Sequence, residues 1–169
     1  MDALEKRLKR LEACESIREC IHLYALAGDR KNDSATLEHV FTADAVYELM
    51  GMGHFEGRKA ILRGLSEIAE TAVLWSFHLP GGPLIKLADD LQSAKVFWWV
   101  WCPAKVRNDD GSVTPAWGAV HYNGQLVDDG GAWKFRRLLL ETRLRVPFDG
   151  PWSELAGPFQ WPDWAHAPR

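Results

Sequence analysis

The first part of the chain carries apolar residues at the spacing of an amphipathic helix. Between residues 3 and 27 they recur every three or four positions, at Leu4, Leu8, Leu11, Ile17, Ile21 and Tyr24. Charged residues fill the opposite face, as expected for a helix that buries one stripe. Gly28 is of the type that commonly ends a helix. The pattern predicts a long helix that ends near Gly28 and buries Tyr24.

Two shorter helices and a hairpin are predicted next. Asp33 is a suitable N-cap for a short helix that carries Leu37, Val40 and Phe41. Residues 45–50 and 54–56 have the pattern of two paired strands, joined by a glycine-rich turn. After Gly57, the helical spacing returns and predicts a third helix, with Ile61, Leu65, Ile68 and Ala72 on one face.

From residue 74 onward the chain has the pattern of strands separated by turns. Strands are predicted at 74–79, 84–87, 94–105, 113–127 and 133–146, with turns rich in Pro, Gly and Asp between them. Helices followed by an antiparallel meander predict an α+β domain over residues 1–146. A twisted sheet of this length must curl. Three helices on its concave side would leave a cone-shaped barrel with an open mouth, which is a natural small-molecule pocket.

The last segment, residues 147–169, has no period and is rich in Pro and aromatic residues. Its large side chains are Trp152, Phe159, Trp161 and Trp164. Such a segment cannot form a regular element, and its aromatic content argues against disorder. We expect a tail packed on the body or on a neighbouring subunit. Together with nine Trp residues in the chain, it predicts a homo-oligomer.

Composition narrows the class of protein. The 169 residues fit one domain, with an ordinary globular balance of 47% hydrophobic and 25% charged residues. A net charge of −3 without a basic stripe argues against a nucleic-acid partner. Three cysteines without a CxxC pair predict free thiols in a reducing cytosol. No apolar run approaches a membrane span and the N-terminus lacks a signal pattern, so we expect a cytoplasmic protein without a membrane partner.

Two residues far apart in the sequence are candidates for acid–base chemistry. Asp29 follows the first predicted helix, and His78 lies in a short apolar run. A carboxylate that orients an imidazole makes a general base near neutral pH. Simpler interpretations are a turn-forming Asp29 and a His78 satisfied within the core. The histidines are scattered and no phosphate-binding loop occurs, so neither a metal nor a cofactor is expected.

The order of elements and several short motifs resemble the SnoaL-like branch of the nuclear transport factor 2-like superfamily. The motifs are Tyr24-x4-Asp29, Phe41-x2-Asp44-Ala45-x-Tyr47, Phe55-Glu56-Gly57-Arg58, His78 and Gly130-Gly131-x-Trp133-Lys134-Phe135. The resemblance implies the cystatin-like cone, assembled as a dimer or trimer. The fold hosts dehydratases, isomerases, cyclases and non-catalytic subunits, so it does not name the chemistry.

The resemblance also implies roles for individual residues. Scytalone dehydratase, bile acid 7α-dehydratase and lindane dehydrochlorinase use a His paired with an Asp in the cone, and His78 and Asp29 fall on those positions. Tyr24 and Tyr47 match tyrosines that hold a water at the substrate in scytalone dehydratase. The dehydrochlorinase also has an arginine on the last strand, five residues after the Trp. Its place is taken here by Leu138.

Further substrate-binding residues are expected on the later strands. Tyr122 matches an aromatic position that faces the pocket. By alternation, Trp98 lies on one face of its strand and Trp101 on the other, and the sequence leaves open which face lines the cone. Arg143 is the candidate cation, although Arg143 or Arg145 would turn inward only through slippage or a bulge.

These residues predict a cofactor-independent lyase, a dehydratase or related elimination enzyme with an Asp–His general base. Its expected substrate is a bulky aromatic or polycyclic small molecule, bound against aromatic walls. An isomerase or cyclase that uses the same base is one alternative. The other is a non-catalytic module for ligand binding or subunit assembly, which a solvent-facing Asp29 would favour.

Overall fold

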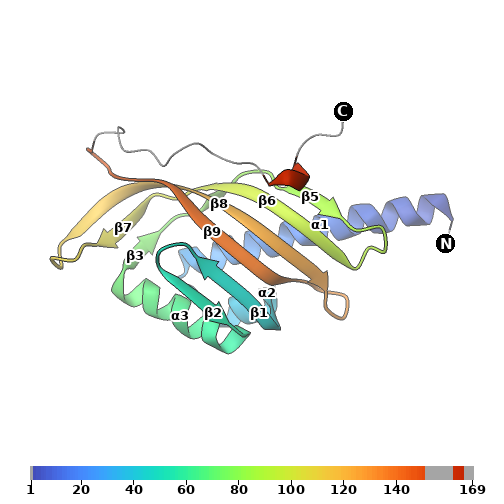
Figure 1. Ribbon diagram of the computed structural model, residues 1–169, viewed down its shortest axis with the longest axis horizontal. Helices are drawn as coiled ribbons and strands as arrows, with labels where there is room; N and C mark the ends of the chain where they lie inside the picture. The colour runs from blue at the N-terminus through green and yellow to red at the C-terminus, as the bar shows by residue number, and fades with distance from the viewer. Residues whose placement is uncertain (1, 151–161, 166–169) are drawn as a thin grey trace.

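The fold is known from a computed structural model that describes residues 2–150 and 162–165. Within these residues, three α-helices lie against one side of a curved nine-stranded sheet (Figure 1). The sheet stays open, because its strand order ends in two edges rather than closing on itself. The predicted α+β class is confirmed. Most of the predicted tail lies outside the described residues, and both its packing and the homo-oligomer stay predictions.

The three helices are α1 (Ala3–Asp29), α2 (Ser34–Val40) and α3 (Arg58–Thr71). The first two begin at a capping carboxylate, whereas α3 has no side-chain cap. The Asp2 carboxylate accepts a hydrogen bond from the Glu5 backbone N–H at 2.8 Å, and the Asp33 carboxylate accepts one from the Thr36 backbone N–H at 3.0 Å. Both are N-caps that satisfy donors left free at a helix start.

Helix α1 ends one residue beyond Gly28, close to the end that the sequence predicted. It continues through Asp29, and the turn is made by Lys31 and Asn32, which have φ angles of 58° and 56°. Asn32 is of a type that tolerates this left-handed conformation. Its side-chain amide also donates to the Leu65 carbonyl of α3 at 2.7 Å. The turn is thereby held against α3, and Gly28 is left for another role.

Only the second half of the α1 stripe is buried. Ile17, Ile21 and Tyr24 face the sheet, whereas Leu4, Leu8 and Leu11 are exposed to 74%, 53% and 68%. The first turns of α1 extend beyond the edge of the sheet, so these leucines have no surface to cover (Figure 1). The predicted helix is therefore present, but the periodicity overstated its buried length.

The sheet consists of nine strands, which pair antiparallel except for β1 and β9. They are β1 (Phe41–Leu49), β2 (Gly53–Glu56), β3 (Val73–Ser76), β4 (Leu79–Pro80), β5 (Leu84–Leu87), β6 (Ser93–Trp101), β7 (Ala104–Arg107), β8 (Val113–Asp128) and β9 (Trp133–Pro147). The main path runs β2-β1-β9-β8-β6-β4. Phe41, predicted on the short helix, instead begins β1.

Two of the predicted strands are interrupted at facing positions. The predicted strand 94–105 breaks between β6 and β7 at Cys102–Pro103, where proline cannot donate to a ladder. Opposite it, the predicted strand 74–79 breaks between β3 and β4 at Phe77–His78, and the Phe77 N–H donates to the Pro103 carbonyl at 3.0 Å. The break releases the His78 backbone N–H from the sheet and leaves it available to another partner.

We predict that the two halves of α1 differ in their contribution to stability. Ile21→Ala removes a fully buried side chain and should lower the free energy of unfolding by about 2–5 kcal/mol. Leu8→Ala lies on the exposed turns and should change it by no more than about 0.5 kcal/mol. Urea denaturation followed by circular dichroism measures both. Equal losses in the two variants would contradict this division of the helix.

Candidate active site

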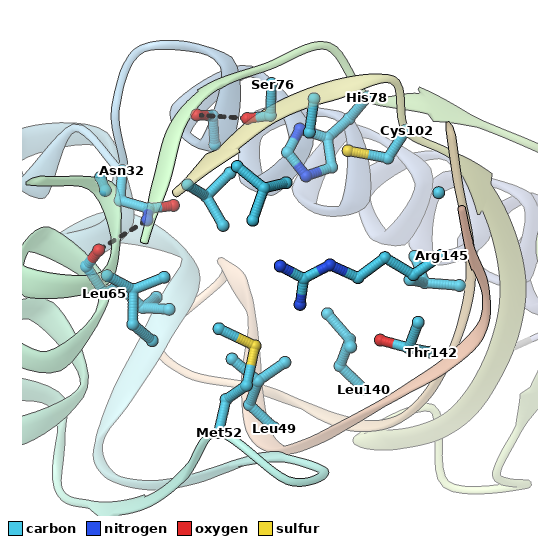
Figure 2. Close-up of a pocket in the computed structure, with 18 of the residues that line it drawn as sticks. Asn32, Leu49, Met52, Leu65, Ser76, His78, Cys102, Leu140, Thr142 and Arg145 are labelled. Carbon is cyan, nitrogen blue, oxygen red and sulfur yellow. Dashed lines mark hydrogen bonds between the residues drawn. The ribbon is translucent and has the colours of Figure 1, made fainter. Parts of the chain in front are cut away.

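A cavity of about 150 Å³ lies between the helices and the concave face of the sheet. Tyr24 and Gly28 of α1 contribute to one side of it, and Leu65 and other residues of α3 to the next. The remaining walls come from the inner faces of the strands (Figure 2). Most of the lining is apolar, and neither Asp nor Glu occurs in it. A polar group there therefore interacts in surroundings that contain few competing charges.

Asp29 and His78 meet at the edge of this cavity. One oxygen of Asp29, Oδ1, accepts two hydrogen bonds from His78, one from the backbone N–H at 2.8 Å and one from Nδ1 at 2.7 Å. The side chains are 22% and 16% exposed, and His78 lines the cavity. Because the carboxylate oxygen is an acceptor, Nδ1 carries the proton, which leaves the Nε2 of a neutral ring as the basic nitrogen.

Gly28 provides the space in which the His78 ring lies. A Cβ at this position would stand 2.7 Å from the ring Cε1 and 3.1 Å from Nδ1. Gly28 is helical, without a positive φ, so its need for glycine comes from this close approach. The sequence suggested a helix stop at Gly28. The structure instead gives the residue a steric role beside the Asp29–His78 pair.

Three tyrosines line the cavity and are almost fully buried, Tyr24, Tyr47 and Tyr122. The Tyr24 and Tyr47 hydroxyls are 2.8 Å apart and share one hydrogen bond. Burial raises the pKa of all three phenols well above the usual value, so they are neutral throughout the ordinary pH range. The Tyr24 hydroxyl also lies close enough to that of Tyr122 to interact with it, so the three neutral phenols form one hydroxyl cluster in the cavity wall.

Cys102 is a cavity residue that the sequence did not single out. It lies at the break between β6 and β7, near His78 (Figure 2). Burial and the nearby Asp29 carboxylate raise the pKa of the Cys102 thiol to about 11. The thiol is therefore protonated near neutral pH, and since the thiolate is the nucleophile, Cys102 is unsuited to covalent catalysis.

Arg145 reaches the cavity because of a bulge in β9. In the β8–β9 ladder, Val120 pairs with Thr142 and Ala119 pairs with Leu144, so Arg143 is an extra residue. Residues three apart on a regular strand face opposite sides, yet Thr142 and Arg145 both line the cavity. Figure 2 shows the Arg145 guanidinium extending into the middle of the cavity.

Three of the residues expected to bind substrate do not line the cavity. Trp98 is on the inner face but stacks behind Tyr122, with ring centroids 4.7 Å apart. Trp101 is on the opposite face and stacks on Trp117 at 5.4 Å. Arg143 is the bulged residue itself and does not line the cavity, and Arg145 is the arginine of this strand that does. Strand alternation separated Trp98 from Trp101 correctly, but it could not tell which face is concave.

The opposite face of the sheet holds a second histidine–carboxylate pair, His121 with Glu141. His121 is buried and lies against the rings of Phe97 and Trp99. Because side chains alternate along β8 and Tyr122 lines the cavity, the neighbouring His121 faces the other side of the sheet. Among the described residues, no three His, Cys, Asp or Glu side chains are grouped so that they could hold a metal ion.

The fold is thus an open curved sheet covered by three helices, with an Asp–His pair at the edge of its cavity. Residues 9–138 match the SnoaL-like domain, so the chain belongs to the SnoaL-like family. The resemblance found in the sequence is thereby confirmed. No curated protein sequence matches the chain.

Several solved structures share the fold. LinA has a TM-score of 0.77 at 17% identity, over 90% of this chain and 99% of that one. Hexachlorocyclohexane dehydrochlorinase LinA-type3 from Novosphingobium barchaimii has a TM-score of 0.76 at 16% identity, and the match covers 90% of this chain and 99% of that one. A putative scytalone dehydratase from Novosphingobium aromaticivorans has a TM-score of 0.69 at 18% identity, and the match covers 90% of this chain and 98% of that one. At such identities the likeness establishes the fold alone. In the described residues, no helix has the length and apolar character needed to cross a membrane.

We predict that Cys20 and Cys102 resist alkylation in the folded protein. Burial raises their pKa values to about 12 and 11, so at pH 8 at most roughly one Cys102 thiol in a thousand is ionised. Iodoacetamide should label both at least tenfold more slowly in buffer than in denaturant, as measured by mass spectrometry of their peptides. Equal labelling rates in the two conditions would show that these thiols are accessible.

Proposed function

We propose that the protein is a cofactor-independent lyase that removes a proton and a neighbouring leaving group from a small cyclic molecule. The observation that carries the proposal is the Asp29–His78 pair, held by two hydrogen bonds at the edge of an otherwise apolar cavity. A partly buried carboxylate–imidazole pair without a function would lose hydration and give little stability in return. The pair has the hydrogen-bonded geometry that a general base requires.

In the proposed reaction, Nε2 of His78 takes a proton from a carbon next to an activating carbonyl. The electrons of the broken C–H bond form a double bond, and the bond to the leaving group breaks with its electron pair. Asp29 keeps Nδ1 protonated and stabilises the imidazolium that forms. A leaving hydroxide takes a proton from a phenol of the Tyr24–Tyr47 pair and departs as water; proton transfer from the imidazolium restores both groups.

The cavity supports a smaller substrate than the sequence suggested. A volume of about 150 Å³ is of the size that holds about one benzene-like ring. A polycyclic ligand needs several hundred Å³ in a typical pocket. We therefore propose a single-ring substrate that lies against Tyr24, Tyr47 and Tyr122, with polar substituents directed at His78 and at the mouth.

The related structures agree with this reaction type in their names. One is named a hexachlorocyclohexane dehydrochlorinase, and the Novosphingobium aromaticivorans protein is named a putative scytalone dehydratase. Both names denote an elimination. Because these proteins are only 16% and 18% identical to this chain, their substrates are not transferred to it.

An isomerase is the second candidate, and the tyrosine pair is the observation that favours it. A hydroxyl donor in a buried site stabilises an enolate as well as a departing hydroxide. The same base would then return its proton to another carbon instead of losing a leaving group. The two reactions share proton removal by His78 and differ only in their products.

We predict that turnover depends on both members of the pair. His78→Gln removes the base and Asp29→Asn removes the orienting carboxylate, so each should lower kcat by about 10²–10⁴-fold. The assay uses single-ring ketones with a hydroxyl or halide β to the carbonyl, and follows the absorbance of the unsaturated product. Deuterium uptake from D₂O at the acidic carbon reports proton removal separately. Uptake without loss of the leaving group would favour the isomerase, whereas undiminished uptake and turnover in His78→Gln would refute both.

A second prediction concerns Gly28. In Gly28→Ala, the added methyl must displace the His78 ring, so turnover should fall at least tenfold. The helix itself prefers Ala to Gly by about 1 kcal/mol, so stability should stay near the wild-type value. Gly82→Ala is the matched control, because a Cβ there meets no atom within 4 Å. Comparison of kcat with urea denaturation tests the prediction, and an active Gly28→Ala enzyme would contradict it.

A further inference from the structure

Among the described residues, Arg145 differs from the other arginines of its strand in that it has no hydrogen-bond or ion-pair partner. Arg136 and Arg137 pair with Asp44 and Glu48 at 3.7 and 3.3 Å. Within residues 2–150 and 162–165, no hydrogen bond or ion pair is made by the Arg145 guanidinium. Its neighbours in the cavity include no carboxylate that could supply a counter-charge. A permanently charged group of this kind is a ready site for an anion.

The position of Arg145 inside the cavity is built into the backbone. The bulge at Arg143 turns Arg145 to the concave face beside Thr142, at the cost of one regular pairing in the longest ladder of the sheet. The partner of Arg145 on β8 is Gly118, where a Cβ would stand 2.7 Å from the Cys102 carbonyl oxygen. Bulges often occur next to active sites, where they redirect a side chain. An arginine whose only function was solubility would need no such redirection.

The side chain is exposed, so its charge remains hydrated in the free protein. It extends from the sheet toward the cavity centre, with His78 and Cys102 on one side and Met52 and Leu49 on another (Figure 2). A ligand in the apolar part of the cavity would therefore meet Arg145, which is the permanent cation among the described residues that line the site. A carboxylate matches the planar fork of the guanidinium through two parallel hydrogen bonds.

From this geometry we infer that the substrate carries a carboxylate, and that Arg145 binds it. The inference deepens the proposed function and rests on it: the substrate class becomes single-ring carboxylic acids. The ring fills the apolar cavity, the carboxylate lies on Arg145, and the carbon that loses its proton faces His78. Arg145 is then the residue that fixes the direction in which the ligand enters. A neutral ligand of the same shape lacks this anchor.

The test is a binding comparison that requires no turnover. Benzoate, phenylacetate and 3-phenylpropanoate are each titrated beside the corresponding neutral amide, by calorimetry with the full chain. Wild type should bind the best-fitting carboxylate at least about tenfold more tightly than its amide, as expected for a charge-assisted bidentate pair. The chain length with the largest preference reports the separation between the ring site and Arg145.

Three variants make the result specific. R145Q should reduce the ratio of carboxylate to amide affinity to about one. R145K should retain part of this preference, because an ammonium keeps the charge but lacks the planar fork of the guanidinium. R137Q removes the same charge from the same strand, outside the cavity, and should retain the full preference. Thermal denaturation verifies that each variant is folded, which is expected because both arginines are exposed.

A fourth variant separates this inference from the proposed reaction. H78Q removes the base but should keep the carboxylate preference, so Arg145 binding stands even where catalysis fails. A preference that survives R145Q overturns the inference, as does a wild type that binds no member of the series or binds acids and amides equally. Loss of the preference in H78Q also overturns it, because His78 would then be the anion-binding group.

Discussion

The site depends on one carboxylate oxygen that accepts two hydrogen bonds from the same residue. Asp29 Oδ1 holds both the backbone N–H and the Nδ1 of His78, which fixes the ring in position and in tautomer. Each partner is available for a structural reason. Asp29 is the last residue of α1, whose inner face is anchored by Ile17 and Ile21. His78 lies where a sheet edge is interrupted, so its N–H is not used in a ladder. The fold thus brings the end of a helix to a gap in a sheet.

Much of the fold could be predicted because most of its helices and strands have a regular spacing of apolar residues in the sequence. The three helices, the hairpin and most strands follow from the spacing of apolar residues and from turn-forming clusters. The failures have physical causes that periodicity does not contain. Leu4, Leu8 and Leu11 are exposed because nothing lies beside them, which depends on where the sheet ends. The break at Pro103 was missed because the apolar run 96–102 before it was extended through residue 105.

The candidate site was predicted less completely than the fold. The Asp29–His78 pair and the three tyrosines were found through motif order, since residues 49 apart in sequence have no local signal that joins them. Arg143 was chosen over Arg145 because the position of a bulge depends on pairing across the sheet. Gly28 was taken for a helix stop, since a steric contact with a ring 50 positions away leaves no trace in its surroundings. Function here depends on such departures from regular structure.

The bulge in β9 also means that the number of residues in the strand does not by itself determine which side chains at its end face the cavity. Thr142 pairs with Val120 and Arg145 pairs with Gly118, and Arg143 is the additional residue between Thr142 and Leu144. The same pairs would form if Arg143 were absent. Loss of the codon for residue 143 would leave a regular ladder with the same side chains facing inward. Insertion of one residue elsewhere in this strand would move every later side chain to the opposite face of the sheet, unless a second bulge formed. An insertion elsewhere in β9 would therefore change which side chains, charged or apolar, face the cavity mouth.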